Sequence, residues 1–390
     1  MKVLYDYQAF TIQHFGGVSK CFCELIANLP NDVKAEIAIR QSNNVHLQQH
    51  RLVDDLKPAN LDEIIFTNRL NIKGIHRLYN CLSNLGIIRG AEWINRQASI
   101  KSLKNSDFDV FHSTYYDPYF LKYIGNKPWV ITVHDMMPEL FPQYYKKNDI
   151  QRMFKHKYLQ SASAIVAVSE TTKKDIVKLL GIQPEKIKVI YHGGPIKEVI
   201  TEKSMIDSPY FLYVGVRSSY KNFTQTVFDF TKFSKKYGKV KLVCTGSEFT
   251  ENEKRLFHQC GIGESVVHLR VSDIELKNLY AHAIAFIYPS LYEGFGMPIL
   301  EAYAYGCPVM LNDIEVFHEI AGHAAIYFKS FNGSSNLSSL LEKMYKINGN
   351  VRKELINKGY TQLLKYSWKR SAGQLADLYK SVLKSSFFNL

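Results

Sequence analysis

Short runs of apolar, β-branched and aromatic residues alternate with longer amphipathic stretches along almost the whole chain. The runs are nearly continuous in Val, Ile, Phe and Tyr, which is typical of parallel strands buried on both faces. The stretches between them, such as residues 17–29, 170–181 and 273–283, carry apolar residues at helical spacing. Strands that alternate with helices predict βαβ units, and therefore a doubly wound α/β fold.

The strand-like runs fall into two sets, and 390 residues exceed what one hydrophobic core usually supports. The first set is KVLYDY, AEIAIR, EIIFT, VFHSTY, PWVITVHD, AIVAVS and KIKVIYHG; the second is YFLYVGV, KVKLVCTG, SVVHLRV, AIAFIYPS, PVMLND and AAIYF. A polar segment flanked by Pro195 and Pro209 separates them. We therefore predict a Rossmann-like domain at 1–194, a linker at 195–209, a second Rossmann-like domain at 210–366 and a helical C-terminal segment at 367–390.

The formal net charge is +13, which favours an anionic partner: nucleic acid, a phosphorylated substrate or a membrane surface. The six cysteines show no CxxC pair and no metal-ligand spacing, so we expect reduced thiols in a cytoplasmic protein. The N-terminus resembles no signal peptide, and no apolar run approaches the ~18 residues needed to span a bilayer. Any membrane contact is therefore expected to be peripheral.

The segment SLYEGFGMPILEAYAYGCPV, residues 290–309, joins the strand-like run IAFIYPS to a short helix. Pro298 suits the first turn of that helix, and Gly306 suits the position just past its end. The loop between strand and helix thus lies at the carboxyl end of a strand, where ligands bind in open α/β sheets. Its glycines let the backbone approach a ligand, and free N–H groups of the first turn attract phosphate.

Two carboxylates frame this loop. Glu301 is expected in the first helical turn, where it can accept two hydrogen bonds from a vicinal diol such as ribose. Glu293, on the loop itself, can do the same for another polyol. Groups that suit a ribose diol, a phosphate and a sugar thus follow one another in this segment, and a nucleotide sugar contains all three. Each acid taken alone could instead only complement the helix dipole.

Cations follow the first strand-like run of the second domain. Arg217 and Lys221 come after FLYVGV, again at a carboxyl end. Two cations beside a diphosphate would neutralise the leaving group as a glycosidic bond breaks, although they could also be solvated loop charges.

The first domain offers weaker candidates. Gly16 and Gly17 follow the first strand and precede a helix expected from Val18. His134 ends the run PWVITV and could bond a sugar hydroxyl, or be only a satisfied polar residue. Asp107 and Asp109 form a D-x-D pair, but they precede a strand and so lie at the wrong edge of the sheet for a metal site.

The segment EGFGMPILE resembles the E-x7-E signature of retaining glycosyltransferases of family 4, which have the GT-B fold. FGGVSKCFCELIANL, TVHDMMPELFP and AIVAVSETTKKDI are similar to landmarks of that family's first domain, and YFLYVGVRSSYKNF is similar to its diphosphate-binding loop. The likeness is greatest to the mannosyltransferase-like branch that builds bacterial surface polysaccharides. Two departures are YHGGP, where many members have Asn-Gly-Val-Asp, and a short spacing from Arg217 to Lys221.

The resemblance implies two doubly wound Rossmann-like domains that face a cleft, with the acceptor bound by the first and the donor by the second. The C-terminal helix would cross back to the first domain. The implied enzyme is a retaining hexosyltransferase that needs no metal and no cofactor, its donor substrate being a nucleotide diphosphate sugar. The resemblance implies catalytic roles for Glu293, His134, Arg217 and Lys221, and donor-binding roles for Glu301, Gly294, Phe295, Gly296, Gly16 and Gly17.

Mannose from GDP-mannose is the first expectation for the donor, with a glycan or lipid-linked glycan acceptor in polysaccharide or O-antigen synthesis. A UDP- or TDP-sugar remains an alternative. A basic nucleic-acid-binding protein is a different class, but the chain shows no recognisable binding module. A nicotinamide-dependent oxidoreductase lacks its G-x-G-x-x-G fingerprint after the first strand. A nucleotide-sugar epimerase or a phosphorylase of the same fold also stays open.

Between Arg69 and Lys104 the chain mixes seven Lys or Arg with one acid, Glu92, a net +6. Apolar residues at 72, 75, 78, 79, 82 and 85 follow helical spacing, which predicts an amphipathic helix. This helix either packs on the first domain or lies on the anionic inner face of the plasma membrane and holds the enzyme there peripherally.

Overall fold

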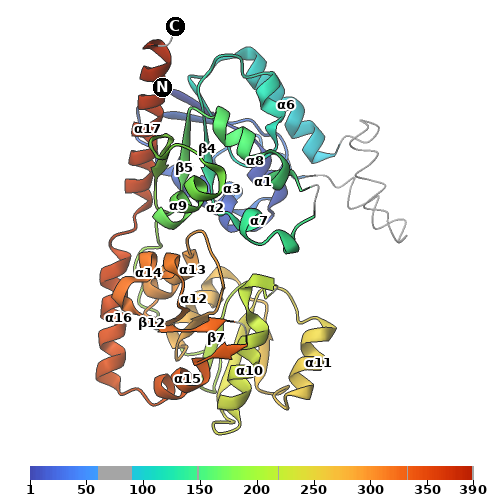
Figure 1. Ribbon diagram of the computed structural model, residues 1–390. Helices are drawn as coiled ribbons and strands as arrows, with labels where there is room; N and C mark the ends of the chain where they lie inside the picture. The colour runs from blue at the N-terminus through green and yellow to red at the C-terminus, as the bar shows by residue number, and fades with distance from the viewer. Residues whose placement is uncertain (60–89, 147–148, 218, 332, 389–390) are drawn as a thin grey trace. The chain divides into compact units, whose positions relative to one another are not determined.

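The computed structural model describes residues 1–59, 90–146, 149–217, 219–331 and 333–388 (Figure 1). The chain divides into two compact units. Unit 1 comprises Met1–Val168, Thr172–His192 and Trp368–Leu390, and unit 2 comprises Ser169–Thr171 and Gly193–Ser367. Residues 190–209 contain no helix or strand.

Unit 1 contains a six-stranded parallel sheet in the order β2-β1-β3-β4-β5-β6. The strands are β1 Lys2–Tyr5, β2 Lys34–Ile37, β3 Val110–Ser113, β4 Trp129–Val133, β5 Ala164–Ala167 and β6 Ile187–Val189. Every residue of β3, β4 and β5 is buried, which explains their continuous apolar sequence.

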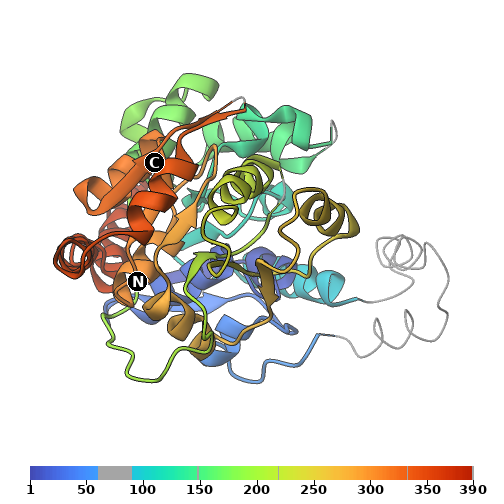
Figure 2. The same cartoon turned by 90° about the horizontal axis from the view of Figure 1, so that it is seen from below.

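Helices flank the strands of this sheet (Figure 1 and Figure 2). They are α1 Gln8–Ile12, α2 Gly17–Ala27, α3 Val45–Gln49, α6 Ala91–Asn105, α7 Met137–Leu140, α8 Ile150–Ser161, α9 Glu170–Leu180 and α17 Trp368–Phe388, with 3-10 turns η1 Pro118–Lys122, η2 Pro142–Tyr144 and η3 Pro184–Lys186. Asp107 and Asp109 lie at the amino end of β3. The Asp107 carboxylate accepts a hydrogen bond from the Lys2 ammonium, and the Asp109 carboxylate accepts one from the Lys2 N–H, so the D-x-D pair stabilises the start of strand β1.

The C-terminal helix α17 lies alongside the blue-to-green elements of unit 1 in Figure 1. Its Tyr379 is fully buried, and the hydroxyl is 2.8 Å from that of Tyr5 on β1 and 2.5 Å from Nδ1 of His112 on β3. Nε2 of His112 is in turn 3.0 Å from the hydroxyl of Thr132 on β4. This buried series of hydrogen-bonded side chains, called the polar chain below, therefore connects the helix to three strands.

Unit 2 contains a second six-stranded parallel sheet, in the order β12-β11-β10-β7-β8-β9. The strands are β7 Tyr210–Tyr213, β8 Lys241–Thr245, β9 Val266–Leu269, β10 Phe286–Tyr288, β11 Val309–Asn312 and β12 Ala325–Phe328; a small antiparallel pair, β13 Ser330–Phe331 and β14 Ser334–Ser335, follows. Renumbered within the unit, the order is 3-2-1-4-5-6, that of a dinucleotide-binding Rossmann fold.

Two helices of unit 2 begin at a capping box that the sequence carries. Thr250 and Glu253 form a reciprocal capping box at the start of α11, and Ser272 and Glu275 do so for α12. The helices are α10 Phe223–Ser234, α11 Glu251–Gln259, α12 Asp273–His282, α13 Met297–Ala304, α14 Glu315–Ala321, α15 Leu337–Tyr345 and α16 Gly349–Leu363, with 3-10 turns η4 Ser219–Lys221 and η5 Gly322–Ala324.

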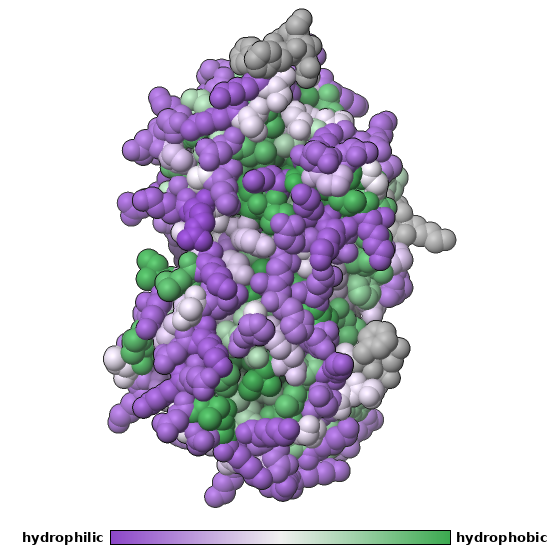
Figure 3. Space-filling model, turned by 60° about the vertical axis from the view of Figure 1, so that its left-hand side comes forward, coloured by the Kyte–Doolittle hydropathy of each residue, from purple (hydrophilic) through white to green (hydrophobic). Residues whose placement is uncertain are grey.

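The predicted fold class is confirmed: each unit is a parallel, doubly wound α/β layer structure. Every strand-like run within the described residues forms a strand, and EIIFT lies outside them. On the face in Figure 3, hydrophilic side chains predominate and hydrophobic ones form separate patches. Among the described residues, no helix has the length and apolar character needed to cross a bilayer.

The buried hydroxyl of Tyr379 gives a first prediction. Tyr379→Phe keeps the ring but leaves the Tyr5 hydroxyl and His112 Nδ1 without this partner, so the free energy of unfolding of unit 1 should fall by about 1–3 kcal/mol. Thermal and urea unfolding measure the change. Tyr144→Phe, at a ring that is 47% exposed, is the matched control and should melt like the wild type. Equal melting of both variants would show that the polar chain does not hold α17.

Candidate functional site

The sheet order of unit 2 places its topological switch point between β7 and β10. From β7 the chain goes on to β8 and β9 on one side, and from β10 to β11 and β12 on the other. Ligands of such sheets bind outside the carboxyl ends of the strands at this point. Two loops lie there: the β7 loop, residues 214–222 except 218, and the β10 loop, residues 289–296. The predicted cations lie on the first loop and Glu293 on the second.

An ion pair joins the two loops. Nζ of Lys221 is 2.5 Å from Oε1 of Glu293, and the two side chains are only 16% and 13% exposed. The ring of Tyr288, the last residue of β10, lies 5.6 Å from the same ammonium. Burial, and next the Glu293 carboxylate, raise the pKa of Tyr288 well above its ordinary value. The structure therefore brings together two of the four predicted catalytic residues.

Backbone and amide bonds hold the loops in register. The Leu291 N–H donates to the Tyr220 carbonyl at 2.8 Å, which ties the β10 loop to the β7 loop. The Asn312 side chain at the end of β11 donates to the Ser290 carbonyl and accepts from the Ser330 N–H. Ser290 is fully buried, and its Oγ has no hydrogen-bond partner in the described part of the chain. A buried hydroxyl in that state is a place where a ligand atom could bond.

The β10 loop ends at the start of α13. Gly296 is the N-cap residue with φ +110°, a conformation that favours glycine, and a Cβ there would meet the Ile299 side chain at 3.0 Å. Phe295 is buried, with its ring 5.8 Å from that of Tyr366, so its side chain packs within unit 2. The Gly294 carbonyl accepts a hydrogen bond from Ser169 at 2.7 Å. The predicted donor-binding residues here therefore offer a shaped backbone rather than side chains.

Glu301 is the fifth residue of α13, because the helix begins at Met297. The prediction that Glu301 lies in the first turn is therefore wrong, since the helix starts one residue earlier than its proline suggests. Burial, and next the Glu301 carboxylate, raise the pKa of both Tyr280 and Tyr305. The carboxylate thus lies among phenol groups, close to the switch-point end of the helix.

Arg217 turns away from the ion pair. Its Nε lies 2.8 Å from Oε1 of Glu253 on α11, and the Arg217 side chain is only 4% exposed. The guanidinium also donates to the carbonyl of Thr245, the last residue of β8, and to those of Ser247 and Glu248 in the loop that follows. Burial acts to raise the pKa of Glu253, but bonds from Arg217 and Thr250 outweigh it and the pKa is lowered. The structure does not bring Arg217 together with Lys221 and Glu293.

In unit 1, Gly16 and Gly17 form the start of α2. Gly17 is its first residue, one position before the expected start. A Cβ on Gly16 would meet the end of the Gln13 side chain at 2.4 Å, whereas one on Gly17 would meet nothing within 4 Å. The Gln13 side chain accepts from the Ser19 N–H at 3.0 Å and so caps the helix. The close packing at Gly16 is therefore with the protein's own side chain.

His134 immediately follows β4, as predicted. Its Nε2 is buried and has no hydrogen-bond partner in the described part of the chain. Burial, and next the nearby Lys155, lower the pKa of His134 to about 4, so the imidazole is neutral at pH 7. Its ring stacks on His192 at 5.8 Å, and Nδ1 of His192 is 3.1 Å from Sγ of Cys21.

A buried carboxylate at the end of β1 was missed by the sequence reasoning. Asp6 accepts hydrogen bonds from the Thr114 N–H at 2.9 Å, from its hydroxyl at 2.5 Å and from the Gln8 amide at 2.6 Å. Burial raises its pKa to about 6, although these bonds act against the rise. Asp6 and Thr114 follow β1 and β3, the switch point of this sheet. The only signal was a polar residue at the end of a strand-like run.

Sequence profiles of known families match most of the chain. Residues 15–196 match the profile described as Glycosyltransferase Family 4, and residues 197–362 match that of Glycosyl transferases group 1. Together the two matches cover every predicted site residue and, of the described strands, all but β1. The chain belongs to the family 4 glycosyltransferases.

Two curated relatives of this glycosyltransferase are O-antigen enzymes by name. The O-antigen chain mannosyltransferase RfbU of Salmonella typhimurium is 33% identical over 198 residues, which are 50% of this chain and 55% of that protein. The O-antigen chain mannosyltransferase B of Escherichia coli is 26% identical over 268 residues, 64% of this chain and 70% of that protein. The matched stretch thus spans about half the length of the Salmonella relative.

Solved structures show the same fold. The crystal structure of Anabaena Alr3699/HepE in complex with UDP and glucose has a TM-score of 0.73 at 15% identity, covering 98% of this chain and 100% of that one. A sucrose-phosphate synthase from Thermosynechococcus elongatus has a TM-score of 0.70, also at 15% identity, covering 98% and 99%. These similarities confirm the predicted GT-B fold class of the glycosyltransferase.

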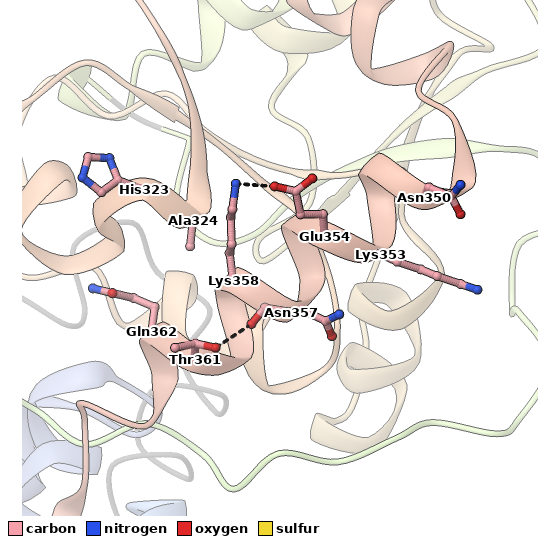
Figure 4. Close-up of a pocket in the computed structure, with 9 residues that line it drawn as sticks. All are labelled: His323, Ala324, Asn350, Lys353, Glu354, Asn357, Lys358, Thr361 and Gln362. Carbon is pink, nitrogen blue, oxygen red and sulfur yellow. Dashed lines mark hydrogen bonds and ion pairs between the residues drawn. The ribbon is translucent and has the colours of Figure 1, made fainter.

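A cavity of about 570 Å³ in unit 2 contains none of the predicted site residues (Figure 4). It is lined mainly by α16, together with His323 and Ala324 of η5. Within it Lys358 is paired with Glu354 at 2.7 Å, and the Thr361 hydroxyl donates to the Asn357 carbonyl at 3.0 Å. Because these groups satisfy one another, the switch point of the glycosyltransferase is the stronger candidate.

The partners of Arg217 give a second prediction. Arg217→Met keeps the stem but leaves the Glu253 carboxylate and the carbonyls unpaired, so the free energy of unfolding should fall by about 3 kcal/mol. Differential scanning calorimetry measures the change. Arg255→Met, at an exposed arginine on the same helix as Glu253, is the control and should melt like the wild type. If the Arg217→Met protein melts normally, the bonds of Arg217 do not stabilise the fold, and the guanidinium of the wild type is available for a ligand.

Proposed function

We propose that this glycosyltransferase transfers a hexose, with retention of configuration, from a nucleotide diphosphate sugar to a glycan or lipid-linked glycan acceptor. GDP-mannose is the first choice of donor, and a UDP- or TDP-sugar is the alternative. The observation that carries the proposal is the Lys221–Glu293 pair at the switch point of unit 2. The curated relatives support mannose and O-antigen, because both are named O-antigen chain mannosyltransferases.

The cation is suited to a diphosphate leaving group. As the glycosidic bond breaks, negative charge grows on the diphosphate, and an ammonium beside it stabilises that charge. Lys221 and Glu293 are both largely buried, so their electrostatic interactions are stronger than in water. We propose that Lys221, with the N–H groups at the start of α13, takes the role that a metal ion has in other phosphate chemistry. No cofactor is part of the proposal.

The two glutamates take different parts of the donor in this proposal. Glu293 bonds Lys221 through Oε1, and its carboxylate has further acceptor capacity for sugar hydroxyls. Glu301, among the phenols of Tyr280 and Tyr305, accepts both hydroxyls of the ribose. His134, whose Nε2 makes no hydrogen bond within the described residues, would bond a donor-sugar hydroxyl. The first domain would bind the acceptor.

The predicted membrane helix stays a proposal. Arg69, Lys73, Arg77 and the apolar positions 72–85 lie outside the described residues. The net charge of +13 suits peripheral contact with the anionic inner face of the plasma membrane, which would bring the enzyme to a lipid-linked acceptor. The same charge prompted the nucleic-acid alternative, which has lost its support because both units match glycosyltransferase profiles.

A thermal-shift screen against GDP, UDP, TDP and their sugars tests the proposal. A nucleotide at 100 times its dissociation constant adds about 2.7 kcal/mol to the free energy of unfolding, which is readily visible. We expect GDP and GDP-mannose to give the largest shifts, and a donor-dependent nucleotide release assay then measures transfer. A shift with none of the six ligands would refute the proposed function.

Glu301 gives the third prediction. Glu301→Gln keeps the size of the side chain but weakens a charge-assisted interaction with the ribose diol, which is worth about 1.5–3 kcal/mol. The affinity for the free nucleotide, measured by titration calorimetry, should therefore fall roughly ten-fold or more. Glu251→Gln, at a side chain that is 79% exposed, is the control. Unchanged affinity in a folded Glu301→Gln protein removes Glu301 from the ribose site.

Lys221 gives the fourth prediction. Lys221→Ala should lower turnover at saturating donor by roughly 10²-fold, and lower affinity for the free nucleoside diphosphate less, because its partner charge grows only as the bond breaks. Lys232→Ala, at an ammonium that is 66% exposed, should keep normal turnover. Steady-state kinetics with the best donor from the screen measure both. Near-normal turnover of Lys221→Ala would contradict its catalytic role.

A further inference from the structure

Three potential metal ligands from distant parts of the sequence converge in unit 1. Cys21 lies on α2, His134 follows β4, and His192 lies three residues after β6. Sγ of Cys21 is 3.1 Å from Nδ1 of His192, although 171 residues separate them. One ligand atom from each of the three side chains lies within 4.8 Å of the other two. Among the described residues, this is the one such group of three His, Cys, Asp or Glu side chains.

The surroundings fix the two imidazole rings. His134 and His192 stack at 5.8 Å with an interplanar angle of 27°. Phe22 meets His134 edge-on at 5.8 Å, and the Trp368 ring lies 5.7 Å from His192. Nε2 of His134 is buried and makes no hydrogen bond within the described residues. Packed aromatic rings therefore hold nitrogen and sulfur atoms close together, and one of these nitrogens makes no hydrogen bond within the described residues.

We propose that Cys21, His134 and His192 form a binding site for a single Zn²⁺ ion. One thiolate and two imidazoles are ligands that zinc prefers, whereas Mg²⁺ and Ca²⁺ prefer oxygen, and no carboxylate belongs to this group. Zinc bond lengths of ~2.3 Å to sulfur and ~2.0 Å to nitrogen place tetrahedral ligand atoms roughly 3.3–3.6 Å apart. The Cys21–His192 pair, at 3.1 Å, is slightly closer than this spacing, and all three ligand atoms lie within 4.8 Å of one another, so small side-chain movements would bring them to it.

The charge nearby is compatible with a bound cation. Lys155 acts electrostatically on His134, but its ammonium is 3.1 Å from the Glu139 carboxylate and 2.9 Å from the Asp135 carbonyl. Loss of the thiol proton on binding supplies one negative charge directly to the ion. The three ligands leave the fourth tetrahedral position to a water molecule. All ligands belong to unit 1, so the site does not use the Lys221–Glu293 pair; it does use His134, and a bound ion would keep that imidazole from the donor-sugar hydroxyl of the proposed function.

Metal binding is measured on the full-length chain after chelator treatment, with Zn²⁺ alone and then with Co²⁺ as a spectroscopic substitute. We expect one Zn²⁺ per chain by competition with a chromogenic chelator, and a thiolate-to-cobalt charge-transfer band in the near ultraviolet. Mg²⁺ should not compete. The measurement needs no sugar donor, so its result does not depend on the proposed function.

Cys21→Ser should weaken Zn²⁺ binding by at least about ten-fold and abolish the thiolate band, and His192→Gln should weaken binding similarly. Cys23→Ser is the matched control, because Cys23 is also buried on α2 but does not belong to the group. A wild-type protein with no thiolate band, or a Cys21→Ser protein that keeps it, would overturn the proposal. The wild-type spectrum decides the matter even if a variant does not fold.

Discussion

The ion pair between Lys221 and Glu293 holds the β7 loop against the β10 loop, and the arrangement of the switch point in unit 2 depends on it. The two side chains are 16% and 13% exposed, so neither charge is well solvated. Removing one partner would leave the other buried without compensation, which is strongly unfavourable. The pair thus holds the two loops in place at the switch point.

The second cation of the β7 loop has a different role. Arg217 gives its guanidinium to Glu253 and to backbone carbonyls, so it contributes to the positions of the loops after β7 and β8. Before any ligand binds, Lys221 and Glu293 cancel in charge. A diphosphate would therefore depend on the N–H groups and dipole at the start of α13 as much as on a net positive pocket. In the proposed function the loop would therefore use the backbone geometry of Gly296 as well as the lysine.

The sequence was sufficient for the described strands, the two switch-point loops and the C-terminal end of α13, because these depend on local patterns: continuous apolar runs and a glycine at φ +69° just past the helix. The partner of Arg217 was not predictable, because Glu253 lies 36 residues away and comes close only through the pairing of β7 with β8. The one-residue error at Glu301 has a local cause, since proline fits either of the first two helical positions. Cys21 and His192 are 171 residues apart, and no spacing rule connects them.

Polar side chains at the carboxyl ends of the strands in unit 1 are mostly committed to one another. Asp6 is bonded by Thr114 and Gln8, and His112 lies between Tyr379 and Thr132. A ligand that bonded these atoms would first have to break hydrogen bonds that are already made, so it would gain little. His134 differs, because its buried Nε2 has no partner in the described part of the chain. An unmet buried nitrogen is where a new bond gains most, and this holds whether the partner is a sugar hydroxyl or a metal ion. Both roles use His134, so zinc at this site would withdraw that imidazole from a donor sugar.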